Sequence, residues 1–153
     1  GLVPRVGGFE GGTVTWAPTN ITYGHNNRSA QFRLPQNRYC IENRAADMTM
    51  NVYLALAMTL SASVVGIKNK IDPGKPTDQD LYQMTDAEFK KLRIKQLPKN
   101  LLQAIEALRN NKLADEVLGT VMKKSFLSYK NDEWERYHQA VTDWEVKEYL
   151  RLY

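Results

Sequence analysis

The amino-acid sequence predicts an α+β fold, in which a small antiparallel sheet or hairpin packs on a long buried helix with several further helices. Between residues 26 and 44, polar and apolar residues alternate with the two-residue period of strands. From residue 47 onward, apolar residues recur at three- and four-residue steps, as they do in helices. We therefore expect one domain, with strands and loops over residues 1–46 and mainly helices over residues 47–153.

The amino-acid composition is that of an ordinary globular protein. The chain has 153 residues, a formal net charge of +4 and a single cysteine, Cys40, and its apolar fraction of 42% is that of ordinary globular proteins. One cysteine excludes an internal disulfide framework and suits a reducing compartment, so we expect a cytoplasmic protein. The uncharged stretch from Val52 to Ile67 is shorter than the run of about 20 apolar residues that crosses a bilayer, so no membrane partner is expected.

The first residues predict loops and turns. Residues 5–12 are rich in glycine and carry one acid, Glu10, which indicates a mobile loop. Thr13 to Trp16 predicts a short strand, and Tyr23 to Asn26 predicts a turn that leads into the hairpin. His25, in that turn, is expected to be solvated, because no partner ligands for a metal lie nearby in sequence.

The two strands of the expected hairpin lie on either side of Pro35. If Leu34 pairs with Tyr39 across a four-residue loop, two faces follow from the alternation. The apolar face holds Ala30, Phe32, Leu34, Tyr39 and Ile41. The polar face holds Ser29, Gln31, Arg33, Cys40, Glu42 and Arg44. A carboxylate flanked by guanidinium groups can hold a divalent cation and phosphate oxygens, which points to phosphoryl chemistry. From spacing alone, ordinary surface ion pairs of Glu42 with the neighbouring arginines are the alternative.

Apolar positions from Tyr53 to Ile71 predict one long buried helix. Asp47 or Thr49 can cap its start, and the run Asp72-Pro73-Gly74 ends it. Its small residues would let the apolar face of the hairpin approach closely, so its task is to hold the polar face in place.

The second half predicts a helical covering. Thr85 and Thr142 are each followed three residues later by glutamate, which is the pattern of the capping box, and Asn100 is a looser start signal. Gly119 predicts a left-handed end to a short helix over residues 112–118, and a longer helix follows it.

One dense basic run could indicate a nucleic-acid-binding domain. It consists of Lys90, Lys91, Arg93, Lys95 and Lys99. The run contains leucine and isoleucine but no aromatic residue on which a base could stack, so we interpret it as a solvated helix edge and expect no nucleic-acid partner.

A succession of short motifs resembles the C-terminal part of the catalytic domain of glutamine synthetases. The motifs are Asn27-Arg28-Ser29-Ala30, Arg33-Leu34-Pro35 and Ile41-Glu42-Asn43-Arg44 with Asp47 beyond. The likeness continues in order through Asn51 to Ala57, Gly66 to Lys70, Asp72-Pro73-Gly74, Asp80-Leu81-Tyr82, Leu97-Pro98 and Asp143-Trp144-Glu145. Within the family, the sequence from Thr15 to Asn27 is similar to that of the branch that includes γ-glutamylmethylamide synthetases.

The resemblance implies a ligase of nitrogen metabolism that uses ATP and Mg²⁺ or Mn²⁺. Such an enzyme joins the γ-carboxyl of glutamate to ammonia or a small amine through γ-glutamyl phosphate. By the same resemblance, Arg28 would hold the transferred phosphoryl group and glutamate, and Arg33 would contact the ATP phosphates. Glu42 would bind the metal, and Arg44 would bind the carboxylate of glutamate.

Two positions depart from the family pattern. Cys40 stands where the family has a further ATP-contacting arginine, so either Arg38 reaches in from the loop or that contact is missing. The family also has a flap with a glutamate near Glu10, although the glycine spacing differs here.

The resemblance also implies partners. The remaining metal ligands would come from upstream parts of the same catalytic domain, and neighbouring subunits of a homo-oligomer would complete the protein. The isolated chain is therefore expected to be inactive. A non-catalytic interaction or regulatory module derived from the same fold remains the alternative function.

Overall fold

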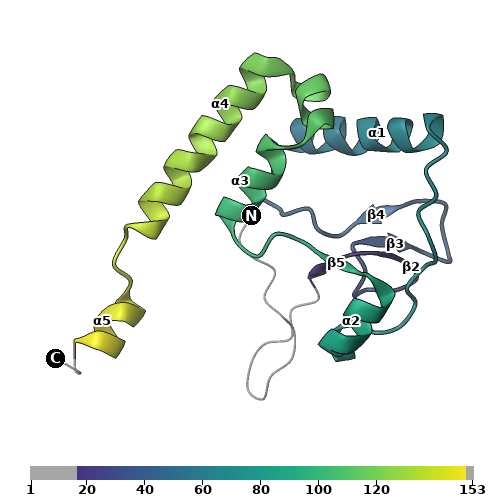
Figure 1. The fold of residues 1–153 in the computed structure, drawn as a ribbon, viewed down its shortest axis with the longest axis horizontal. Coiled ribbons are helices and arrows are strands. Elements are labelled where there is room, and N and C mark those ends of the chain that lie inside the picture. The colour runs from purple at the N-terminus through teal and green to yellow at the C-terminus, as the bar shows by residue number, and fades with distance from the viewer. Residues whose placement is uncertain (1–16, 151–153) are drawn as a thin grey trace.

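The computed structural model describes residues 17–150, so Glu10 and the predicted strand from Thr13 to Trp16 lie outside the described residues. The α+β prediction is confirmed: short strands occupy one region and helices dominate the rest (Figure 1). The strands are β1 (Asn20–Ile21), β2 (Tyr23–His25), β3 (Phe32–Leu34), β4 (Glu42–Asn43) and β5 (Lys95–Gln96). The helices are α1 (Val52–Lys68), a 3₁₀ turn (Leu81–Gln83), α2 (Asp86–Leu92), α3 (Leu101–Arg109), α4 (Lys112–His138) and α5 (Asp143–Tyr149).

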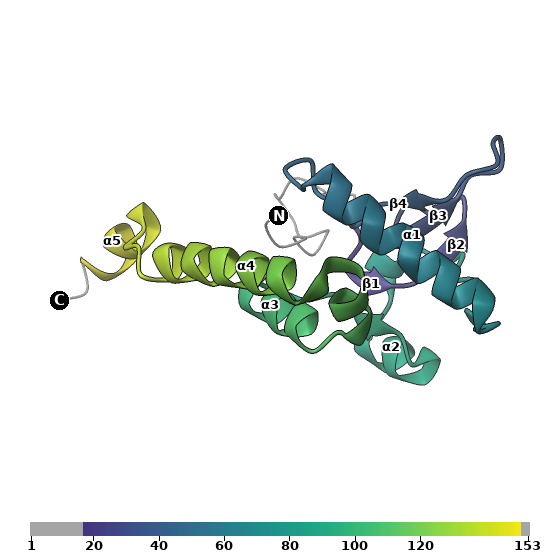
Figure 2. The ribbon, with the colours of Figure 1, turned by 90° about the horizontal axis from the view of Figure 1, so that it is seen from above.

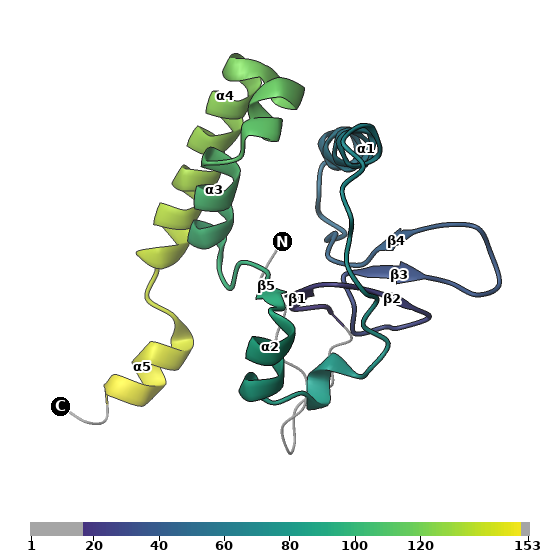
Figure 3. The ribbon, with the colours of Figure 1, turned by 45° about the vertical axis from the view of Figure 1, so that its right-hand side comes forward.

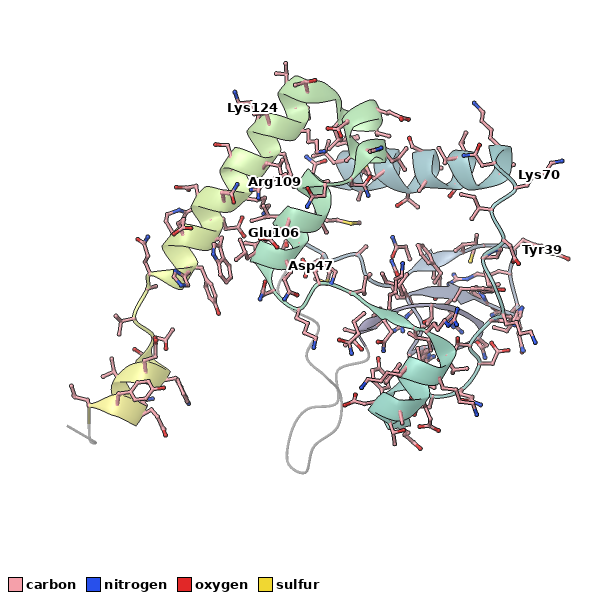
Figure 4. The ribbon with its side chains drawn as sticks, viewed as in Figure 1. Tyr39, Asp47, Lys70, Glu106, Arg109 and Lys124 are labelled. Atoms are coloured by element: carbon pink, nitrogen blue, oxygen red, sulfur yellow. The ribbon has the colours of Figure 1, made fainter. Side chains whose placement is uncertain are left out.

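The main sheet has the order β2-β3-β4 and is mixed, whereas an antiparallel hairpin was expected. Strand β3 runs antiparallel to β4, with Arg33 opposite Glu42, so the pairing is shifted by two residues from the expected match of Leu34 with Tyr39. A two-residue shift keeps each side chain on its predicted face. It also lengthens the loop, and Tyr39 and Ile41 are exposed instead of in the core; Figure 4 shows Tyr39 at the outer end of this loop.

Residues Tyr23 to Asn26 form mostly a strand and not the predicted turn. Strand β2 lies parallel to β3, with Tyr23 opposite Phe32. On its other side it is bonded to a distant segment: the Thr77 amide donates to the Tyr23 carbonyl at 2.8 Å, and the Tyr23 hydroxyl donates to the Gly74 carbonyl at 2.7 Å. Backbone pairing with residues from far along the chain therefore makes this stretch extended. A second small sheet pairs β1 with β5 in antiparallel fashion.

Helix α1 lies over the main sheet, as the end-on view in Figure 3 shows. Its N-cap is Asn51, whose side chain accepts from the amides of Tyr53 and Leu54, so the predicted caps Asp47 and Thr49 were wrong. Asp47 instead accepts from the Thr49 amide in the turn before the helix.

The prediction that α1 is buried does not hold in this chain, because none of its residues is fully buried. Among its apolar side chains, Leu56, Leu60, Val64 and Ile67 are between 47% and 77% exposed. A helix that is apolar on all sides is typical of the interior of a larger protein. One side of α1 is therefore apolar and uncovered. Within residues 17–150, no helix has the length and apolar character needed to cross a membrane.

The local signals of the later helices are confirmed. Complete capping boxes start α2 at Thr85 and α5 at Thr142, and the Asn100 side chain accepts from the Gln103 amide at the start of α3. Gly119 breaks α4 where a helix end was expected, but its φ of 69° and ψ of 165° lie outside the predicted left-handed helical region, in an extended region that is open to glycine. The basic run extends from the end of α2 through β5 to Lys99 before α3, and its side chains are exposed.

A buried lysine fixes the corner between α3 and α4. Lys123 is only 5% exposed, and its ammonium group donates to the carbonyls of Arg109 and Asn111 and to Asp115, at 2.9, 3.1 and 2.7 Å. These bonds satisfy the carbonyl of the last residue of α3, Arg109, and that of the N-cap of α4, Asn111. The longer part of α4 extends from this corner away from the sheets, and α5 lies at its far end (Figure 2).

Candidate active site

The candidate site is built on the pair β3 and β4. Arg33 and Glu42 lie directly opposite each other, and Arg33 Nη1 donates to Glu42 Oε2 at 3.0 Å. Their side chains are only 17% and 25% exposed. An ion pair that is largely shielded from water interacts more strongly than one on the open surface. The sequence alternation thus placed these two residues together correctly.

Two further side chains complete the cluster. Arg38, from the loop between the strands, donates to Glu42 Oε1, and Arg33 Nη2 donates to Asn26 Oδ1 at the end of β2. Two guanidinium groups therefore face one carboxylate, which leaves excess positive charge. The hydrogen bond from Arg33, together with that from Arg38, holds the pKa of Glu42 below its usual value, although desolvation acts in the opposite direction. Glu42 is thus ionised at neutral pH.

Arg38, from the loop, contacts Glu42, whereas Cys40 is exposed. The sequence left open whether Arg38 replaces the ATP-contacting arginine for which Cys40 stands, or whether that contact is missing. The contact with Glu42 places Arg38 in the cluster and leaves an ATP contact as a prediction.

Arg44 and Arg28 lie beside one end of the strand pair. The Arg44 amide donates to the Gln31 carbonyl at 2.8 Å, which places the residue after β4 next to the bend that carries Arg28. Burial raises the pKa of the Tyr82 hydroxyl, and the nearby positive charge of Arg44 opposes this effect. The Arg44 side chain is half-buried, whereas Arg28 is exposed. Arg38 reaches Glu42 from the loop at the opposite end of the pair.

The chemistry of Glu42 fits that of one metal ligand. A carboxylate offers about four lone-pair directions, and the two guanidinium groups use two of them, so oxygen positions remain for a hard cation. Over residues 17–150 there is no group of three or more His, Cys, Asp or Glu side chains that could hold an ion. Glu42 is therefore a candidate for one ligand of an ion and not part of a set of three or more such side chains within residues 17–150.

His25, expected to be a solvated turn residue, lies on β2. Its backbone amide donates to Asp78 Oδ1 at 2.6 Å, and its ring Nδ1 is 3.2 Å from Asp78 Oδ2. The hydrogen bond from the His25 backbone amide, together with that from the His25 ring, lowers the pKa of Asp78. Both side chains are about half exposed, and the pair joins β2 to the segment after α1.

Sequence reasoning missed Asn26 as a contact of Arg33. Asn26 adopts a φ of 51°, a conformation that asparagine accepts more readily than most residues. The position of Asn26 just before the motif Asn27-Arg28-Ser29-Ala30 was the available signal for this contact. The parallel pairing of β2 with β3 brings Asn26 beside Arg33, and no local sequence pattern predicts that pairing.

The chain matches known proteins over nearly all of its length. The model of the glutamine synthetase catalytic domain matches residues 12–149. A glutamate–methylamine ligase from Methyloversatilis universalis is 41% identical over 140 residues, which cover 92% of this chain and 31% of that protein. A glutamine synthetase from Thermus thermophilus is also 41% identical over 140 residues, covering 90% of this chain and 31% of its own length.

Solved structures agree with these matches. A structure described as a GmaS/ADP complex superposes with a TM-score of 0.79 at 34% identity, covering 91% of this chain and 32% of the other. A GmaS structure without ligand gives a TM-score of 0.74 at 34% identity, covering 88% of this chain and 30% of that one. The chain spans about a third of the length of the relatives that it matches. Its catalytic-domain match and its ordered motifs establish that this chain belongs to the glutamine synthetase family.

Proposed function

We propose that this chain is the C-terminal part of the catalytic domain of an ATP-dependent ligase that forms a γ-glutamyl amide from glutamate and ammonia or a small amine. The observation that carries the proposal is the shielded Glu42 carboxylate between the guanidinium groups of Arg33 and Arg38. Relatives that this chain resembles are named ligases of this kind. The rest of the enzyme would come from the remainder of a longer protein, called here the complete ligase.

The reaction needs positive charge at the phosphates. A carboxylate is a poor electrophile, because attack by an amine would add further negative charge to it. Transfer of a phosphoryl group from ATP to the γ-carboxylate forms an acyl phosphate, which offers phosphate as a leaving group. Guanidinium groups stabilise the charge that passes between the phosphates, because their planar donors match phosphate oxygens.

Each arginine of the site receives a role. Arg33 and Arg38 bind the ATP phosphates, and Arg38 takes over the contact that Cys40 cannot make. Arg28 holds the transferred phosphoryl group and the γ-carboxylate. Arg44 binds the α-carboxylate of glutamate, with its position fixed by the backbone bond to Gln31.

Glu42 would be one ligand of Mg²⁺ or Mn²⁺. A bound divalent ion supplies Lewis-acid neutralisation of phosphate charge. Within this chain, Arg33 and Arg38 hold the Glu42 carboxylate in a fixed orientation and keep it ionised, so that its free lone pairs are available to a cation.

The uncovered apolar side of α1 supports the proposal that this chain is part of a larger domain. Exposed apolar side chains at Leu60 and Ile67 would be covered by the upstream part of the catalytic domain. Trp144 and Leu150 on and beside α5 are also exposed, and we propose neighbouring subunits of a homo-oligomer as their partners. The exposed free thiol of Cys40 suits a cytoplasmic enzyme.

The amine can be determined by direct comparison. Equal identities to a glutamate–methylamine ligase and to a glutamine synthetase leave both amines in the proposal. Phosphate release by the complete ligase should be measured with ATP, Mg²⁺ and glutamate, and with methylamine, ethylamine or ammonia at matched concentrations. We expect amine-dependent release and a γ-glutamyl amide product. Release with no amine dependence, or none at all, would refute the proposed function.

A further inference from the structure

The bend that carries Arg28 is tied down by the neighbouring side chain of Asn27. Asn27 Nδ2 donates to the carbonyls of Thr77 and Gln79, at 2.7 and 2.8 Å. Asn27 Oδ1 accepts from the amide and the hydroxyl of Ser29, at 2.9 and 2.7 Å. These four bonds use both donors and both acceptor positions of the amide. The side chain therefore joins the bend to a segment 50 residues away.

Ser29 extends the same connection. Its hydroxyl accepts from the Leu81 amide at 2.9 Å while it donates to Asn27. Ser29 is 4% exposed, and Ala30 and Leu81 beside it are buried as well. Arg28 thus stands between two anchored residues, although its own side chain is exposed. The position of its guanidinium therefore depends on the backbone that carries it.

We propose that Asn27 is a positioning residue, which fixes the backbone of Arg28 against residues 77–81 so that the guanidinium meets the transferred phosphoryl group. The assignment rests on the proposed function for the role of Arg28. An amide is required, because an aspartate cannot donate to two carbonyls and an alanine leaves both carbonyls and the bend without their connection. A displacement of about 1 Å in a reacting group can lower a rate by roughly 100-fold.

The test is a double-mutant cycle in the complete ligase, with amine-dependent phosphate release as the readout. Asn27→Ala should lower kcat by about tenfold or more, with a smaller change in the Michaelis constant for ATP. In an Arg28→Lys background, the same substitution should lower kcat by less than about threefold, because residues that act through one another are not additive. Asn131→Ala is the matched control, since that amide donates to the Leu127 carbonyl within α4, and it should leave kcat unchanged.

The outcomes separate the two levels of the proposal. Equal losses from Asn27→Ala in both backgrounds would show that Asn27 acts independently of Arg28 and would overturn the assignment. Should Asn27→Ala fail to fold in a thermal melt, Ser29→Ala removes one hydroxyl of the same connection and should give a smaller loss with the same dependence on Arg28. A wild-type ligase without turnover would overturn the proposed function and, with it, this role for Asn27.

Discussion

Gly24 should accept no side chain without local movement, because it lies against the Thr77 carbonyl. A Cβ atom at Gly24 would lie 2.3 Å from the Thr77 carbonyl oxygen and 2.9 Å from the Asn27 Cβ. Ordinary contact begins at 3.4 Å, so Gly24→Ala requires a movement of about 1 Å by a backbone group that cannot rotate away.

That movement has a calculable cost. Displacement of the Thr77 carbonyl breaks the 2.7 Å bond from Asn27 Nδ2 and strains the adjacent bond from the Thr77 amide to the Tyr23 carbonyl. Overpacking costs about 1–3 kcal/mol and a lost hydrogen bond about 1 kcal/mol. We expect the attachment of residues 74–81 to β2 to weaken by about 2–4 kcal/mol, which makes local opening more frequent by about 30- to 900-fold.

Amide hydrogen exchange of the complete ligase measures this directly. In Gly24→Ala, the amides of Thr77 and Leu81 should exchange faster by the stated factor. Gly66→Ala is the matched control: a Cβ there meets nothing within 4 Å, and alanine favours the helix by up to about 1 kcal/mol. Unchanged exchange at Thr77 and Leu81 in Gly24→Ala, or equal acceleration in Gly66→Ala, would refute this interpretation of the contact.

Three further predictions concern the site. The 153-residue chain alone should release no phosphate from Mg-ATP with glutamate and amines, because its described residues offer Glu42 without a metal cluster; robust turnover would contradict a split site. In the complete ligase, Arg38→Ala should raise the Michaelis constant for ATP by about tenfold, and Cys40→Ala should leave it unchanged; equal effects would remove Arg38 from the ATP site. The pKa of Glu42 is lowered in the folded protein, so the ionised carboxylate stabilises the fold at pH values above its ordinary pKa of 4.5. This stabilisation is lost as the pH falls through the folded-state pKa. A carboxyl NMR titration should therefore place its midpoint below 4.5 in wild type and higher in Arg33→Gln; no change on removing Arg33 would contradict the pairing.

The parts of the fold that local chemistry determines were predictable. The capping boxes at Thr85 and Thr142 require only residues three positions apart, and the break at Gly119 requires only a residue that accepts a positive φ. The common face of Arg33 and Glu42 follows from strand alternation, which any shift by an even number of residues preserves.

The parts that distant contacts determine were not predictable. Alternation cannot distinguish the pairing of Arg33 with Glu42 from a pairing two residues away, so the loop length and the contact of Arg38 remained undetermined. Strand β2, which pairs in parallel with β3, is also bonded to residues 74–77, and no residue near β2 in the sequence predicts these distant contacts. The burial of α1 was inferred from its composition, but burial also requires a covering surface, and the described residues leave one side of α1 uncovered.

Glu42 and Arg44 have separate tasks in the proposed ligase site, and a single pair of substitutions tests this most directly. In the complete ligase, Glu42→Gln keeps the shape of the side chain but removes its negative charge, so the Mg²⁺ concentration for half-maximal rate should rise by about tenfold or more, with much of the rate recovered at high Mg²⁺. Arg44→Lys keeps the charge but loses the planar fork, so the Michaelis constant for glutamate should rise by about tenfold or more with the Mg²⁺ requirement unchanged. If both variants lower thermal stability and leave the Mg²⁺ and glutamate dependences as in wild type, the two residues are structural and the proposed site is contradicted.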